Sequence, residues 1–187
     1  PFDTILVHDP SELSGKRFIL THENLLKLKE KGYAKKIGLS IYSDDQLAGI
    51  KNYFVPDVVQ VPVNLLDQRA LNSLELIGLK ELGCEIHARS IFLQGLLAMG
   101  IYNRPSTLST DLTDLKRVYQ YSDMANISVR KLALNWILSQ PFLDKIVVGV
   151  ESVEQLNQIV ADIDEGLHLD FDHISSLASH NVELIEP

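Results

Sequence analysis

The sequence KIVVGVESVEQLNQIV, residues 145–160, restricts the fold more than any other stretch of the chain. Residues 146–148 and Val150 form a β-branched run with almost no polarity, which is typical of a strand buried on both faces of a parallel sheet. Gly149 lies at the end of this run, where a missing side chain lets the backbone approach a ligand. The stretch therefore predicts a strand over 145–150 that ends at a place suited to binding.

A helix is predicted to begin directly after this strand. Ser152 is a suitable N-cap and Gln155 follows three residues later, which makes a capping box of the S-x-x-Q type. Apolar residues then recur at helical spacing: Val153, Leu156, Ile159, Val160 and Ile163. The first N–H groups of this helix have no partner within the helix and would point toward the place where the strand ends at the glycine. Such an arrangement suits a phosphate. An ordinary βα turn that binds nothing is the commoner case, and this segment alone leaves it open.

Length, charge and cysteine content exclude several classes of protein. The chain has 187 residues, enough for a single domain over 1–187 with a core of its own. The formal charge of −8 and the lack of a basic run argue against nucleic acid as a partner. No apolar stretch is long enough to span a membrane, and PFDTILVHDP does not resemble a signal peptide. Cys84 is the single cysteine, so we expect neither a disulfide framework nor a metal cluster, and we expect Cys84 to be a buried packing residue. The expected location is therefore a reducing compartment, with a soluble cytoplasmic protein.

Short apolar runs alternate with amphipathic segments along the whole chain. Strands are predicted at residues 4–7, 36–41, 58–63, 84–88 and 145–150. The segments between them carry helical patterns, including 112–124 and 129–139. This alternation predicts an α/β fold with a parallel sheet, either doubly wound or part of a (β/α) barrel. Neither G-x-G-x-x-G nor a P-loop sequence occurs.

Polar groups gather where the predicted strands end. They are His8, Ser40, Gln60, Arg89 with Ser90, and Gly149 with Glu151. Five consecutive strands that each deliver polar groups at the C-terminal end have the layout of a barrel active site. This coincidence favours the barrel over the open sheet.

Six segments, in this order and at this spacing, resemble the aldo-keto reductase family. They are ILVHDP, KKIGLSIYSDDQL, VVQVPVNLLDQR, EIHARSIFLQGLL, LALNWILSQP and VVGVESVEQL. The resemblance covers nearly the whole chain. It implies a (β/α)8 TIM-barrel type of fold, here an incomplete barrel that lacks the first three strands. It also implies hydride transfer between a nicotinamide cofactor and a small-molecule carbonyl substrate, without metal or flavin.

The resemblance assigns roles to three residues at the strand ends. His8 matches the histidine that orients the substrate carbonyl, although a histidine ending an apolar strand is more often a structural hydrogen-bonding residue. Ser40 and Gln60 match the positions that hold the nicotinamide carboxamide, which needs both a donor and an acceptor. A glutamine inside an apolar strand must in any case find a partner. Arg89 is assigned a substrate role or a structural ion pair with equal weight.

The remaining cofactor contacts implied by the resemblance fall in two segments. The loop over the pyrophosphate is matched by Ser90, Phe92 and Gln94. The segment around the adenosine phosphate and adenine is matched by Gly149, Glu151, Ser152, Gln155 and Gln158. The cofactor implied is NAD(H) or NADP(H).

Three departures from the family pattern restrict these expectations. Ile41 stands where the family usually has asparagine, which removes one expected carboxamide contact. Glu151 stands where many members carry a base that pairs with the 2′-phosphate of NADP, so NAD(H) is the preferred cofactor. The catalytic aspartate, tyrosine and lysine belong to the three strands that this chain lacks. We therefore expect the chain alone to be inactive and to associate with the N-terminal barrel portion or a second copy.

Two other functions stay open at this stage. One is a non-catalytic nucleotide-binding or regulatory module that keeps the cofactor groove. The other, an unrelated phosphate-binding lyase of the barrel type, is disfavoured because no lysine at a strand end suggests a Schiff base.

Overall fold

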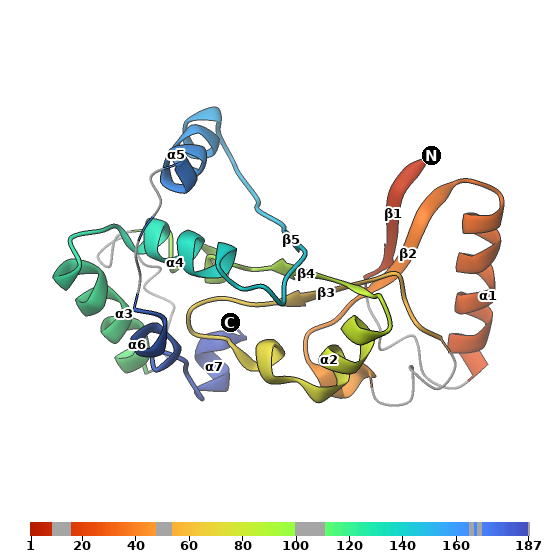
Figure 1. Ribbon diagram of the computed structural model, residues 1–187, viewed down its shortest axis with the longest axis horizontal. Coiled ribbons are helices and arrows are strands. Elements are labelled where there is room, and N and C mark those ends of the chain that lie inside the picture. Colours follow the sequence, from red (N-terminus) through yellow and green to blue (C-terminus); the bar gives the residue numbers. More distant parts are fainter. Residues whose placement is uncertain (9–15, 48–53, 100–110, 165–166, 168–169, 187) are drawn as a thin grey trace. The chain divides into compact units, whose positions relative to one another are not determined.

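The computed structural model describes residues 1–187 except 9–15, 48–53, 100–110, 165–166, 168–169 and 187 (Figure 1). The chain divides into two compact units, each assembled from three segments. Unit 1 comprises Pro1–Pro62, Arg69–Arg89 and Phe142–Lys145. Unit 2 comprises Val63–Gln68, Ser90–Pro141 and Ile146–Pro187.

A five-stranded sheet follows the order of the chain. Its strands, in the order β1-β2-β3-β4-β5, are β1 (Phe2–Val7), β2 (Ala34–Ser40), β3 (Val58–Pro62), β4 (Glu85–Arg89) and β5 (Lys145–Ile146). The first four strands pair in parallel, each with the next along the chain. A doubly wound sheet reverses its strand order at a switch point, whereas the wall of a (β/α) barrel does not. The observed order is therefore that of a barrel wall.

Helices follow most of the strands. In unit 1 they are α1 (Lys16–Glu30) and α2 (Leu74–Glu81), with the 3₁₀ turns η2 (Asp44–Leu47) and η3 (Arg69–Asn72). In unit 2 they are η4 (Leu93–Gly95), α3 (Thr113–Met124), α4 (Val129–Leu138), α5 (Val153–Asp164), α6 (Phe171–Ser175) and α7 (Val182–Ile185). Serine caps begin two of them, because Ser73 accepts the N–H of Leu76 at 3.2 Å and Ser128 accepts the N–H of Lys131 at 3.1 Å.

The two faces of the sheet in unit 1 differ sharply in polarity. One face is apolar and fully buried, and it consists of Ile37, Leu39, Val59, Val61, Ile86 and Ala88. The alternate positions on β2, β3 and β4 include Lys36, Ser40, Gln60, Glu85, His87 and Arg89. Because side chains alternate along a strand, these polar residues share the opposite face. The sheet thus packs its core on one side and presents hydrogen-bonding groups on the other.

Two aspartates at the beginnings of strands tie the sheet together. Asp57 accepts the backbone N–H of Ile37 at 2.9 Å, and Lys29 donates to the same carboxylate. Asp144 accepts the N–H of Ile86 at 2.7 Å and a hydrogen bond from Lys80. Burial raises the pKa of Asp144, but Lys80 and the Ile86 N–H outweigh it, so its pKa lies below the ordinary value. This end of a barrel sheet serves stability rather than chemistry.

The outermost strands are less buried than the sequence predicts. The predicted strand over 145–150 is wrong beyond Ile146, because β5 has two residues and the side chains of Val147 and Val150 are exposed. Residues 4–7 of β1 form a strand as expected but are only half-buried. Both strands end the observed strand order, so each has a sheet neighbour on one side only in the described part of the chain.

Candidate functional site

A row of polar residues crosses the sheet of unit 1 at one level. Ser40 pairs in register with Gln60, and Gln60 pairs with His87. Register partners on parallel strands project to the same face about 5 Å apart. β1 ends one residue before His8, in the register that puts His8 beside Ser40, and the His8 side chain is exposed. Ser40 and Gln60, which the sequence selects separately, are thus neighbours on one face, and His8 directly follows the strand that pairs with β2.

Ser40 and Gln60, the two central residues of this row, have side-chain donors and acceptors available for a ligand. Ser40 is buried and Gln60 is half-buried. No side-chain hydrogen bond is made by either residue within the described part of the chain, although the Gln60 backbone carbonyl accepts the N–H of Ile41 at 2.8 Å. A hydroxyl and a carboxamide side by side offer both donors and acceptors. They could hold an amide group of a ligand.

The other end of the same face holds an ion cluster. Glu85 bonds to His87 at 3.0 Å and pairs with Lys36 across the sheet. Lys36 and His87 hold the pKa of Glu85 below its ordinary value, and Glu85 raises the pKa of Lys36. These groups satisfy one another, so His87 is engaged structurally.

Arg89 is also held by the protein. Its guanidinium donates to the carbonyl of Ile41 at 3.1 Å and lies 4.6 Å from the centroid of the Tyr42 ring. Both contacts fix the chain that follows β2. The side chain of Ile41 is fully buried, which fits the apolar residue found where the family usually has asparagine. These contacts are structural, but neither of them is the ion pair with an acid that the sequence analysis considered for Arg89.

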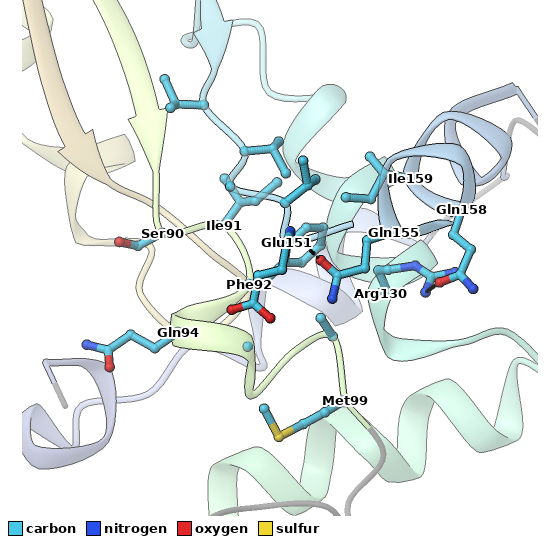
Figure 2. A pocket seen from close by; sticks show the side chains of 16 residues that line it. Ser90, Ile91, Phe92, Gln94, Met99, Arg130, Glu151, Gln155, Gln158 and Ile159 are labelled. Carbon is cyan, nitrogen blue, oxygen red and sulfur yellow. Dashed lines mark hydrogen bonds between the residues drawn. The ribbon is translucent and has the colours of Figure 1, made fainter. Parts of the chain in front are cut away.

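Unit 2 contains a cavity of about 630 Å³, within the range of small-molecule sites. Seven of the predicted cofactor residues line it: Ser90, Phe92, Gln94, Gly149, Glu151, Gln155 and Gln158. Figure 2 shows Phe92, Glu151 and Gln155 near one another, with Ser90 and Gln94 on the loop after β4 pointing away from them and Gln158 further along α5. Ser152 does not line the cavity. The structure therefore brings together most of two segments that lie more than fifty residues apart in the sequence.

The loop after β4 is held in an uncommon conformation. Ser90, Leu93 and Gln94 have φ angles of 55°, 45° and 50°, in the left-handed region that non-glycine residues rarely enter. Such residues cost about 1–3 kcal/mol each and concentrate at ligand clamps. Asn64 supports the loop by donating to the carbonyl of Ser90 at 3.3 Å. The strain makes this wall of the cavity a candidate binding element.

The segment before α5 has the predicted cap with one difference. The Ser152 hydroxyl accepts the N–H of Gln155 at 3.2 Å, as a capping box requires. The Gln155 side chain accepts the N–H of Glu151 at 2.8 Å, one residue before the N-cap. Two N–H groups of this turn are thereby occupied. No atom lies within 4 Å of the position that a Cβ on Gly149 would take, so the backbone there is open to a ligand.

Arg130 is the charged residue of the cavity lining that the sequence analysis missed. It lies in the first turn of α4 and donates from Nε to Asp162 at 2.6 Å. Its Nη1 donates to Gln158 at 2.8 Å (Figure 2). A cation in the first turn of a helix opposes the helix dipole. That local conflict was the available signal that Arg130 needs an acidic partner.

The fold defines an α/β protein of the barrel type, with polar groups at the C-terminal ends of its strands. Residues 1–181 match the model of the Aldo/keto reductase family. The chain belongs to this family. A search of curated proteins finds no match.

Solved structures of aldo-keto reductases share the fold. The apo form of AKR11C1 from Bacillus halodurans aligns with a TM-score of 0.75 and 21% identity over 95% of this chain and 62% of its own. The Brucella melitensis aldo/keto reductase aligns with a TM-score of 0.64 and 23% identity over 94% of this chain and 60% of its own. The chain thus spans about three fifths of the length of these structures.

Membrane-spanning helices and metal sites can be assessed for the described residues only. No helix among them has the length and apolarity needed to cross a membrane. They also contain no group of three His, Cys, Asp or Glu side chains that could hold a metal ion. Cys84 is buried as expected, and burial raises the pKa of its thiol to about 12.

Proposed function

We propose that this chain is the cofactor-binding portion, strands four to eight, of an NAD(P)-dependent oxidoreductase with a (β/α)8 barrel. The complete protein would reduce aldehydes or ketones, or oxidise alcohols. The observation that carries the proposal is the adjacent pair Ser40 and Gln60, whose side chains have no partner within the described chain. The strand order supports a barrel in which the first three strands come from elsewhere.

The residues of unit 1 serve the reacting end of the cofactor in this proposal. Gln60 and Ser40 would exchange hydrogen bonds with the nicotinamide carboxamide of a bound cofactor and so fix the orientation of the ring. The chemistry supplied by that group when bound would be hydride transfer to the carbonyl carbon of the substrate, or from the alcohol. His8 directly follows β1, whose last residue Val7 pairs with Leu39, and would donate a hydrogen bond to the substrate oxygen.

The residues of unit 2 match the phosphate and adenosine contacts of the family. The strained loop at Ser90 and Gln94 would hold the pyrophosphate, and Gly149 would let the backbone approach the adenosine phosphate. Gox0644, of which a mutant has been solved in complex with NADPH, is 22% identical to this chain with a TM-score of 0.62. In this chain Glu151 lines the cavity and would repel an additional phosphate. On this ground we propose NAD(H) as the preferred cofactor.

The chain alone lacks the acid that completes the reaction. A carbonyl reduction needs a proton at the oxygen as hydride reaches the carbon. The family's tyrosine, lysine and aspartate belong to the part of the barrel not contained in these 187 residues. We propose that 1–187 is one domain of a cytoplasmic protein, since each of its units is assembled from three interleaved segments.

Cofactor titration separates this proposal from its alternatives. NADH fluorescence should rise saturably on addition of the 187-residue chain, and the chain should not oxidise NADH with a panel of aldehydes. The complete protein should do both. Failure of the chain to bind either reduced cofactor would contradict the proposal, and binding without turnover in the complete protein would favour a non-catalytic nucleotide-binding module.

A further inference from the structure

Two glutamine side chains of α5 line the cavity of unit 2 with their carbonyl oxygens already engaged. The Oε1 atom of Gln155 accepts the backbone N–H of Glu151 at 2.8 Å. The Oε1 atom of Gln158 accepts a hydrogen bond from Nη1 of Arg130 at 2.8 Å. An amide carries its acceptor oxygen and its donor nitrogen on opposite sides. Each oxygen is turned toward its internal donor, so the two amide nitrogens are the groups left for a ligand.

Arg130 determines which end of the Gln158 amide faces away from it. A guanidinium group can donate hydrogen bonds but cannot accept them, so the Gln158 atom that faces Arg130 has to be the oxygen. The guanidinium is itself held by Asp162, which accepts from Nε at 2.6 Å in a partly buried ion pair (Figure 2). We call the three side chains Gln155, Gln158 and Arg130 the donor wall of the cavity, because donors are what they offer to a ligand.

We propose that Arg130 is a positioning residue that makes the donor wall recognise the acceptor atoms of a purine base. This inference rests on the proposed function and deepens it by naming what the wall selects in a nucleotide. On its N7 side, adenine presents one acceptor beside the 6-amino donor, whereas a 6-oxopurine presents two adjacent acceptors, N7 and O6. The donor wall can bond to both acceptors of a 6-oxopurine but to only one of these two groups of adenine. The cavity therefore accepts a 6-oxopurine nucleotide at least as well as an adenine nucleotide.

The role of Arg130 toward Gln158 is separable from its role in helix packing. Two hydrogen bonds join α4 to the end of α5 at Asp162: the bond from Arg130 to its carboxylate, and a bond from Nδ2 of Asn135 to its backbone carbonyl at 3.1 Å. Neither of them involves Gln158. A purely structural Arg130 would hold the two helices together and leave ligand selection unchanged, whereas a positioning residue changes the selection through Gln158.

Calorimetric titration of the full 187-residue chain with AMP and with IMP tests the proposal. The two nucleotides share ribose and phosphate and differ only in the base, so the ratio of their Kd values isolates base recognition. IMP should bind at least as tightly as AMP. Arg130→Met releases the Gln158 oxygen, which can then accept the 6-amino group, and should shift the ratio toward AMP by about three- to tenfold. The carboxylate of Glu151 also lines the cavity, but it is present in both proteins and cancels in this comparison.

Two further variants separate positioning from stability. Asp162→Asn is the matched control, because it removes the charged partner of Arg130 and leaves the Arg130–Gln158 contact in place. It should lower the free energy of unfolding, as Arg130→Met does, and leave the ratio of Kd values unchanged. Gln158→Glu keeps the size of the side chain but replaces the donor nitrogen with an acceptor oxygen. It should weaken binding of IMP about three- to tenfold more than binding of AMP.

Several results would overturn the inference. They are tighter binding of AMP than of IMP by the unmodified chain, no binding of either nucleotide, an unchanged ratio in Arg130→Met, and an equal shift of the ratio in Asp162→Asn. If Arg130→Met does not fold, Gln158→Glu decides alone. NADH titration of the unmodified chain reports separately on the proposed function. NADH binding with an unmoved nucleotide ratio would remove the role of Arg130 only, and the expected ratios without NADH binding would contradict the proposed function only.

Discussion

Gln60 allows a substitution that separates binding from folding. Its side chain is half-buried on β3 and makes no hydrogen bond within the described chain, so Gln60→Leu removes no internal interaction. We expect the free energy of unfolding to change by less than about 0.5 kcal/mol, since an apolar side chain suits a half-buried strand position. The Ser40 hydroxyl beside it would remain in place.

The same change should weaken cofactor binding measurably. The glutamine offers the carboxamide one donor and one acceptor, each contributing about 0.5–1.5 kcal/mol net. Leucine supplies neither and leaves the carboxamide facing an apolar group. A loss of about 1–2 kcal/mol corresponds to a rise of about five- to thirtyfold in the Kd for NADH. Fluorescence titration measures the Kd, and urea unfolding followed by circular dichroism measures stability.

Gln68→Leu is the matched control. Gln68 is buried and donates from Nε2 to the carbonyls of Leu65 at 2.8 Å and Ile174 at 3.4 Å. Losing these bonds should cost about 1–3 kcal/mol of stability and leave the Kd of the folded protein unchanged. The reasoning would be refuted if Gln60→Leu left NADH affinity unaltered, or if it destabilised the protein as much as the control does.

Three further changes test other parts of the structure. Glu151→Arg should shift preference from NADH toward NADPH, measured as the ratio of their Kd values, and an unchanged ratio would remove Glu151 from specificity. Gly38→Ala should lower the free energy of unfolding by about 3 kcal/mol, because the added Cβ would lie 2.0 Å from the carbonyl oxygen of Val58 on β3. Gly78→Ala in α2 should raise it by about 0.5–1 kcal/mol, because nothing lies within 4 Å of the added Cβ. Urea unfolding measures both changes. Folding lowers the pKa of Asp144, so its contribution to stability is complete above its ordinary pKa and is lost as pH falls through the folded pKa. Asp144→Asn should therefore reduce the loss of stability at acid pH. If the loss of stability were unchanged, it would have to come from other carboxylates.

The parallel sheet and the row of site residues could be predicted from the sequence because both follow from local patterns. Apolar runs of four to six residues predicted β2, β3 and β4 within about two residues of their bounds. Their C-terminal ends are adjacent in any parallel sheet, so Ser40 and Gln60 had to meet once the strands were known. Family resemblance assigned a role to this pair but was not needed to bring them together.

The strained loop and the identity of the partners of Arg130 could not be predicted from the sequence, for a different reason. Left-handed φ angles are usually signalled by glycine, and here Ser90, Leu93 and Gln94 adopt them because the surrounding contacts hold them. Arg130 reaches the cavity through helix packing, since Asp162 and Gln158 lie about thirty residues along the chain. Neither feature has a spacing that a single sequence reveals.

The strand prediction for residues 145–150 failed because an apolar composition indicates that a segment is buried, and here burial does not follow from the composition. Ile146, Val147 and Val148 have the composition of a central strand, and a central strand has neighbours on both sides. Here β5 ends the strand order and contains only Lys145–Ile146. The valines that follow have the composition of a buried strand but are not part of one. On α5, Val153, Leu156, Val160 and Ile163 are likewise exposed although they recur at helical spacing, so an apolar pattern predicts the type of element here and not its burial.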